Sequence, residues 1–105
     1  MAKYLLLYHG GSRPESEEAG TQVMAAWVAW FESLGAAVVD GGNPTAAAKS
    51  VAPGGAVSDG AGASPATGYS VLSAESLDAA VRLAQGCPHL KAGGTVAVYE
   101  TLALM

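Results

Sequence analysis

Apolar and polar positions along the chain predict two β-α-β units separated by an irregular segment. The first unit opens with a run of large apolar and aromatic residues, Lys3 to His9, closed by Gly10-Gly11-Ser12-Arg13-Pro14. A run of this length followed by turn residues is typical of a strand. A second, shorter strand is expected from Ala36 to Asp40, before another turn at Gly41-Gly42-Asn43-Pro44.

A helix is predicted between these two strands. It begins at Ser16 or Glu17, where acidic side chains suit the positive end of a helix, and it ends at Gly35, a natural C-terminal stop. Apolar residues recur within it at helical spacing. We expect one buried stripe, with Trp30 at its margin, made of Val23, Met24, Trp27, Val28, Phe31 and Leu34.

The middle of the chain, about residues 43–67, is rich in Ala, Gly, Pro and Ser. Two interpretations remain open for it. Lys49-Ser50-Val51 and Ala56-Val57-Ser58 form two short extended pieces around the turn Pro53-Gly54-Gly55, or the whole segment is a loosely ordered loop.

The second β-α-β unit follows this insert. A strand is expected from Gly68 to Ser73, and a last strand from Thr95 to Leu102. Between them lies an amphipathic helix, capped by Ser73 or Ser76 and ended by Gly86 and Pro88. Its apolar positions are Leu77, Ala80, Val81 and Ala84.

Two such units in one domain of 105 residues favour a ferredoxin-like α+β fold, with both helices on one face of an antiparallel four-stranded sheet. The other face of the sheet then needs polar residues or a cover. The first strand has Leu5 and Leu7 on that face, opposite Tyr4, Leu6 and Tyr8. We therefore expect a homodimer with its open sheet faces stacked about 10 Å apart. A monomer with some exposed apolar residues is the alternative.

Composition agrees with a covered surface. Charged residues make up 13% of the chain, about half the usual ~25%. The net charge of −4 and the scattered basic residues argue against nucleic-acid binding. The single cysteine, Cys87, is expected to be a small buried hydrophobe in a reducing, cytoplasmic protein. The apolar N-terminal run is too short to span a membrane.

Seven segments, taken in order, have a distinctive pattern. They are Lys3 to Tyr8, the helix from Met24 to Leu34, Asp59-Gly60, Gly68 to Val71, Ser73 to Ala80, Pro88-His89-Leu90 and Gly93 to Val96. Together they resemble the YCII-related family, in particular its members with an Asp-Gly-Pro-Phe signature. The similarity runs nearly from end to end, so the whole chain is expected to be one such domain. The resemblance implies a ferredoxin-like dimer, known as the dimeric α+β barrel, and suggests an enzyme, since a His/Asp pair has been proposed as catalytic in the family.

This chain departs from the family pattern at two places. The signature reads Asp59-Gly60-Ala61-Gly62, without the Pro and Phe. Ala97 stands where relatives often carry a glutamate in the last strand. Roles that depend on those side chains are not carried over to this sequence.

Three residues at strand ends or in turns are candidates for acid–base chemistry: His9, Asp59 and His89. Histidine titrates near neutral pH, and a carboxylate can fix its tautomer and stabilise its cation. Each residue also has a plain structural interpretation. Asp59-Gly60 is a common turn sequence, and either histidine can simply bond a backbone carbonyl.

Other kinds of site have less support. A metal held by the two histidines and Asp59 lacks any short-range ligand spacing, and no cofactor fingerprint is present. Gly10-Gly11-Ser12 is better explained as a turn than as an anion-binding loop. Trp27 and Tyr69 are expected to line an apolar pocket for a small ligand, although aromatic residues on a helix stripe are more often core.

The sequence thus predicts a small-molecule-binding protein or an enzyme with His/Asp acid–base residues. A non-catalytic regulatory or interaction module acting as a homodimer is the alternative. Cofactor-free oxygenase or isomerase chemistry is a further alternative that rests on fold analogy alone.

Overall fold

The computed structural model describes residues 1–104, and its order of helices and strands is the predicted one. Two short 3-10 helices, η1 and η2, join the longer elements. The bounds are β1 Ala2–His9, α1 Glu17–Leu34, η1 Gly35–Ala37, β2 Val38–Asp40, β3 Lys49–Val51, β4 Val57–Asp59, β5 Ala66–Ala74, α2 Leu77–Ala84, η2 Pro88–Leu90 and β6 Thr95–Glu100.

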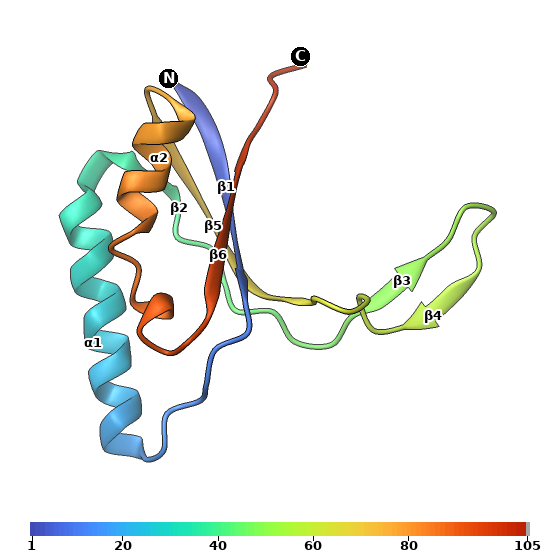
Figure 1. Ribbon diagram of the computed structural model, residues 1–105, viewed down its shortest axis with the longest axis horizontal. Helices are drawn as coiled ribbons and strands as arrows, with labels where there is room; N and C mark the ends of the chain where they lie inside the picture. Colours follow the sequence, from blue (N-terminus) through green and yellow to red (C-terminus); the bar gives the residue numbers. More distant parts are fainter. Residues whose placement is uncertain (105) are drawn as a thin grey trace.

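The main sheet has the strand order β2-β5-β1-β6, and all of its neighbouring strands are antiparallel. Because the two helices connect β1 to β2 and β5 to β6, this is the ferredoxin-like βαββαβ topology. Both helices lie on the same side of the sheet, and the other side is left open (Figure 1). The predicted α+β class and topology are confirmed.

Local sequence signals set the ends of both helices. Ser16 caps α1 by accepting a hydrogen bond from the amide of Ala19, and Ser76 caps α2 through Ala79 in the same way. Gly35 ends α1 with a φ of 55°, a conformation that suits glycine. The predicted second strand is shortened, because its first two residues belong to η1.

The core lies between the helices and the sheet. Every second residue of β1 and β5 is buried there, including Tyr4, Leu6, Leu72 and Ser70. The predicted stripe of α1 is right in part, because Trp27, Phe31 and Leu34 are partly buried and pack against the core. Trp30, placed at its margin, is the buried residue of this helix, and its indole Nε1 donates to the carbonyl of Leu83 at 3.2 Å. The residues Val23, Met24 and Val28 are exposed.

The insert forms a hairpin, so the first of its two interpretations is right. β3 and β4 pair Lys49 with Asp59 and Val51 with Val57, around a turn at Gly54 and Gly55. We call residues 45–65 the arm. It leaves the body after Pro44, returns at the start of β5, and projects on the side away from the helices (Figure 1).

The single cysteine, Cys87, is part of the core. It is 2% exposed, and burial raises the pKa of its thiol, so it packs as a small hydrophobe.

Within residues 1–104, neither helix combines the length and the apolar character that a membrane-spanning segment requires.

Candidate functional site

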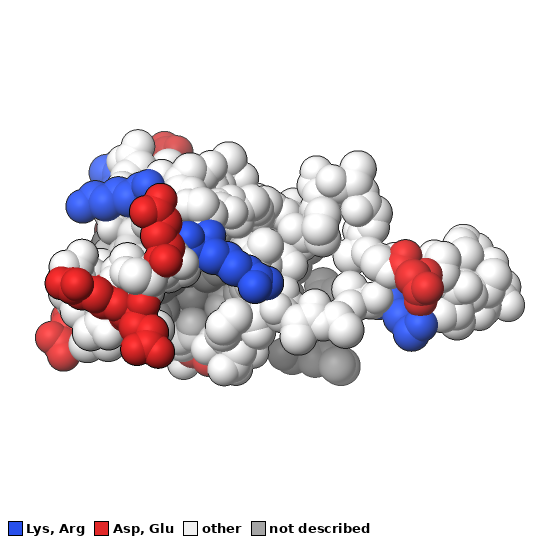
Figure 2. Space-filling view, turned by 90° about the horizontal axis from the view of Figure 1, so that it is seen from below, with Lys and Arg blue, Asp and Glu red and all other residues white. Residues whose placement is uncertain are grey.

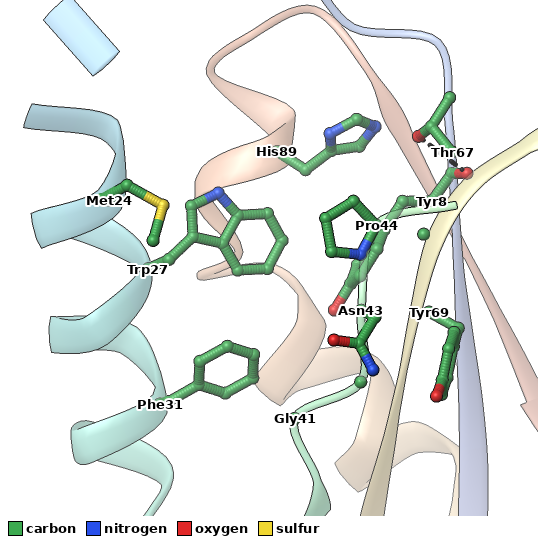
Figure 3. A pocket seen from close by; sticks show the side chains of 12 residues that line it. Tyr8, Met24, Trp27, Phe31, Gly41, Asn43, Pro44, Thr67, Tyr69 and His89 are labelled. Atoms are coloured by element: carbon green, nitrogen blue, oxygen red, sulfur yellow. Dashed lines mark hydrogen bonds between the residues drawn. The ribbon is translucent and has the colours of Figure 1, made fainter. Parts of the chain in front are cut away.

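A cavity of about 350 Å³ opens between α1 and the end of the sheet. Its walls come from α1, from the segment after β2, from the ends of β1 and β5, and from η2 (Figure 3). Trp27 and Tyr69, chosen from the sequence as pocket residues, both border it, although the strand register puts the Tyr69 side chain on the opposite face of the sheet, with Leu7. The other lining residues are Tyr8, Met24, Phe31, Gly41, Gly42, Asn43, Pro44, Thr67, Gly68 and His89.

Aromatic rings make most of one wall of this cavity. Tyr8 and Trp27 meet edge to face with their ring centroids 5.2 Å apart, and Trp27 lies 5.8 Å from Phe31. The ring of His89 is 5.5 Å from that of Tyr8. Such a surface suits a flat apolar compound, since aromatic rings offer both faces and edges for packing.

The imidazole of His89 is held in one position by its surroundings. Its Nε2 lies 2.9 Å from the carbonyl oxygen of His9. Gly11 and Gly94 flank the ring so closely that a Cβ at Gly94 would overlap it, and one at Gly11 would come within 2.8 Å of Cε1. The absence of two side chains thus makes the space that the ring occupies.

The hydrogen bond also defines the protonation of the ring. A carbonyl oxygen can only accept, so Nε2 of His89 carries a hydrogen and donates it. In the neutral imidazole, Nδ1 is then the acceptor. Figure 3 shows this second nitrogen on the side of the ring turned away from β1.

The hydroxyl of Tyr8 is occupied within the protein. It donates to Ser70 Oγ at 2.7 Å, and Ser70 donates in turn to the carbonyl of Gly41 at the same distance. Burial raises the pKa of Tyr8 to about 12, although its hydrogen bond to Ser70 acts in the opposite direction. The polar side chains left at the cavity are therefore chiefly His89 and Asn43.

His9 lies at a different cavity, of about 410 Å³, on the other side of β1. Its Nδ1 is 3.2 Å from the carbonyl oxygen of Pro65, at the base of the arm. Ser64, Thr67 and Thr95 are among its neighbours there. The two histidines are thus linked by the backbone of His9, while their side chains border different cavities.

Asp59 is on the arm and pairs with Lys49, with Oδ1 and Nζ 2.6 Å apart and both side chains exposed. Among the described residues it has no histidine partner, so one protomer does not assemble the predicted His/Asp unit. Nor does any group of three His, Cys, Asp or Glu side chains within residues 1–104 have the geometry to hold a metal ion.

Several cavity residues were not singled out from the sequence. Tyr8 and Phe31 have the pattern of ordinary core residues, and alternation along β1 does not distinguish a core wall from a cavity wall. The Gly41-Gly42-Asn43-Pro44 segment was interpreted only as a turn. Its glycines were a usable signal, because a Cβ at Gly42, which has a φ of 74°, would overlap the backbone of Tyr69.

Comparison with known proteins gives a family and a fold. No curated protein matches the chain. Among solved structures it is similar to 5-chloro-2-hydroxyhydroquinone dehydrochlorinase (TftG) from Burkholderia phenoliruptrix AC1100, in its complex with 2,5-dihydroxybenzoquinone. The identity is 24%, the match covers 93% of each chain, and the TM-score is 0.54, which supports a shared fold. Residues 2–104 match the YCII-related domain, and the chain therefore belongs to the YCII-related family.

Proposed function

We propose that this protein binds a small, flat, largely apolar ring compound in the cavity between α1 and the sheet, with His89 as its polar contact. The observation that carries the proposal is the fixed His89 ring beside an aromatic wall. A pocket of this kind uses its apolar lining for affinity and a few placed polar groups for orientation.

The chemistry of His89 suits a ligand with a hydroxyl group. With Nε2 donating to His9, Nδ1 of the neutral ring accepts a hydrogen bond or a proton from such a hydroxyl. The similarly folded TftG supports this ligand class, since the compound named in its complex is a six-membered ring with two hydroxyls. Acid–base work at the cavity then falls to His89, whereas His9 and Asp59 lie elsewhere in the protomer.

Calorimetric titration with 2,5-dihydroxybenzoquinone and with 1,4-dihydroxybenzene tests the proposal. We expect His89→Gln to weaken binding at least tenfold, because the Gln amide keeps a donor for His9 but removes the basic nitrogen. His9→Gln is the matched control and should leave affinity unchanged. The absence of binding by the unaltered protein at millimolar probe would contradict the proposal, and equal binding by H89Q would remove His89 from it.

The ultraviolet absorption of bound 1,4-dihydroxybenzene separates binding from proton transfer. If His89 takes a proton from the bound hydroxyl, the absorption of the ligand shifts to that of its phenolate in the wild-type complex and not in the complex with H89Q. Tight binding with the absorption of the neutral phenol would instead favour the non-catalytic alternative.

We further propose that the protein acts as a homodimer joined through the open sheet face. No helix of the protomer covers this side of the sheet (Figure 1), and the residues at the centre of the face are apolar or aromatic. The strand register places Leu5, Leu7, Tyr69, Val71, Ala97 and Tyr99 there. Light scattering at micromolar concentration should give about twice the mass of one 10.4 kDa chain, and a monomer mass would contradict the dimer.

A further inference from the structure

Beyond its base, the arm is exposed: among the described residues, nearly every position of the β3–β4 hairpin is open to solvent. Val51 and Val57 oppose each other across the hairpin and are 71% and 63% exposed. The radius of gyration is 15.2 Å, against about 13 Å for a compact domain of this length. The protruding arm accounts for this extended shape (Figure 1).

An isolated two-stranded hairpin is at best marginally stable in water. This one is tied down at its base, where the Thr45 hydroxyl donates to the carbonyl of Ala66 at 2.7 Å. Along the hairpin, the strand ladder is joined by the Lys49–Asp59 ion pair at its base end and by the Ser50 hydroxyl, which donates to the carbonyl of Gly60 at 2.7 Å. An exposed ion pair adds little stability.

We call the side of the hairpin that carries Val51 and Val57 the valine face; the Lys49–Asp59 pair lies on the same side, nearer the base. Burying the two valines against a surface outside the protomer would stabilise the hairpin.

The direction of the arm indicates what that surface is. The helices lie on one side of the sheet, and the arm projects on the other, the side of the apolar open face (Figure 1). A body seated on the open face would lie alongside the arm. That face and the valine face would then be covered by the same partner.

We propose that the arm clasps a second copy of this chain, with Val51 and Val57 packed on the body of the partner. This inference rests on the homodimer proposed above. In a two-fold dimer each arm would reach the other protomer, so the contact forms twice.

Length and charge both favour this occupant. From Thr45 to Gly54 an extended chain spans up to about 30 Å, whereas stacked sheets lie only about 10 Å apart. The arm is therefore long enough to pass the partner's sheet and contact its flank. Its charged residues are Lys49 and Asp59, which neutralise each other, and the rest of its visible surface is uncharged (Figure 2). A nucleic acid or an anionic surface finds no basic patch there.

Two substitutions on adjacent residues of β4 test the clasp. Val57→Asp places a charge on the valine face, and Ser58→Asp places the same charge on the opposite face. We expect sedimentation equilibrium to give a dimer dissociation constant at least tenfold larger for V57D than for the wild-type protein, and a nearly unchanged constant for S58D. A variant in which two glycines replace residues 49–59 should weaken the dimer at least as much as V57D.

The outcomes separate the arm from the dimer. If the wild-type protein is a dimer and both V57D and the shortened variant associate as tightly as it does, the clasp is overturned while the homodimer stands. If S58D weakens association as much as V57D, the assignment of the valine face is overturned. A monomeric wild-type protein overturns both proposals. Near-ultraviolet circular dichroism, which reports the packed tryptophans, shows that each variant keeps its body folded.

Discussion

At the scale of single residues, the polar atoms that the cavity offers to a ligand are those not already hydrogen-bonded within the protein. Tyr8 carries a hydroxyl, yet this hydroxyl donates to Ser70, and the residue as a whole is 6% exposed. His89 donates from one nitrogen and keeps the other. A ligand therefore meets an aromatic surface with a single fixed basic atom, and this explains why the proposal centres on His89.

The buried phenol of Tyr8 makes a prediction about alkaline pH. Its pKa is about 12 in the folded protein and about 10 in an unfolded chain. Below pH 10 the phenol is neutral in both states and contributes no pH dependence. Between pH 10 and 12 the unfolded state ionises first, so the free energy of unfolding should fall by about 1.4 kcal/mol per pH unit from this group.

Urea unfolding of the wild-type protein and of Tyr8→Phe at pH 9, 10 and 11 checks this. The substitution loses the bond to Ser70, at a cost of about 1 kcal/mol at all three pH values. Its unfolding free energy should nevertheless fall less steeply above pH 10 than that of the wild type. If the unfolding free energies of the two proteins fell equally steeply above pH 10, folding would not raise the pKa of Tyr8.

At the scale of elements, α1 shows what helical periodicity can and cannot predict. The helix and both of its ends were predicted, because capping and apolar spacing are local properties. The buried face keeps Trp27, Phe31 and Leu34 of the predicted stripe but is centred on Trp30. Periodicity alone does not give this, because Trp30 hydrogen-bonds to the carbonyl of Leu83, which is distant in sequence.

The corrected face of α1 predicts unequal costs for two alanine substitutions. Trp30→Ala removes a buried ring and its hydrogen bond, so it should lower the unfolding free energy by about 3–5 kcal/mol. Val28→Ala, at a 51% exposed position, should change it by no more than about 0.5 kcal/mol. Chemical denaturation measures both. A larger loss for Val28 than for Trp30 would restore the stripe expected from periodicity.

The same contrast between local and distant information applies to the candidate site. The sequence indicates His89 by its residue type and its position in a turn, and Trp27 and Tyr69 as aromatic residues between the helices and the sheet; all three border the cavity. The relation between the histidines was not accessible, since β1 and η2 are about eighty residues apart and meet only through the fold. For Asp59, a catalytic pair and a turn were both compatible with the sequence, and the structure places it in an ion pair on the hairpin.

At the scale of the whole molecule, the open sheet face and the arm both expose apolar residues to solvent. The sheet has helices on one side only, and the hairpin has cover on neither side (Figure 1). The low content of charged residues, 13%, leaves few groups to keep such surfaces apart in water. A homodimer would bury both the open sheet face and the valines of the arm in one interface.

Such a dimer links stability to concentration. If folding and association are coupled, mass action raises Tm as protein is added. A hundredfold increase should raise Tm by about 6 °C for a dimer of this size. Leu7→Glu places a charge in the centre of the open face and should abolish the concentration dependence. Val28→Glu introduces the same charge on exposed α1 and should preserve it. Scanning calorimetry at two concentrations makes the comparison, and a wild-type Tm that does not move would show that the sheet face is not an interface.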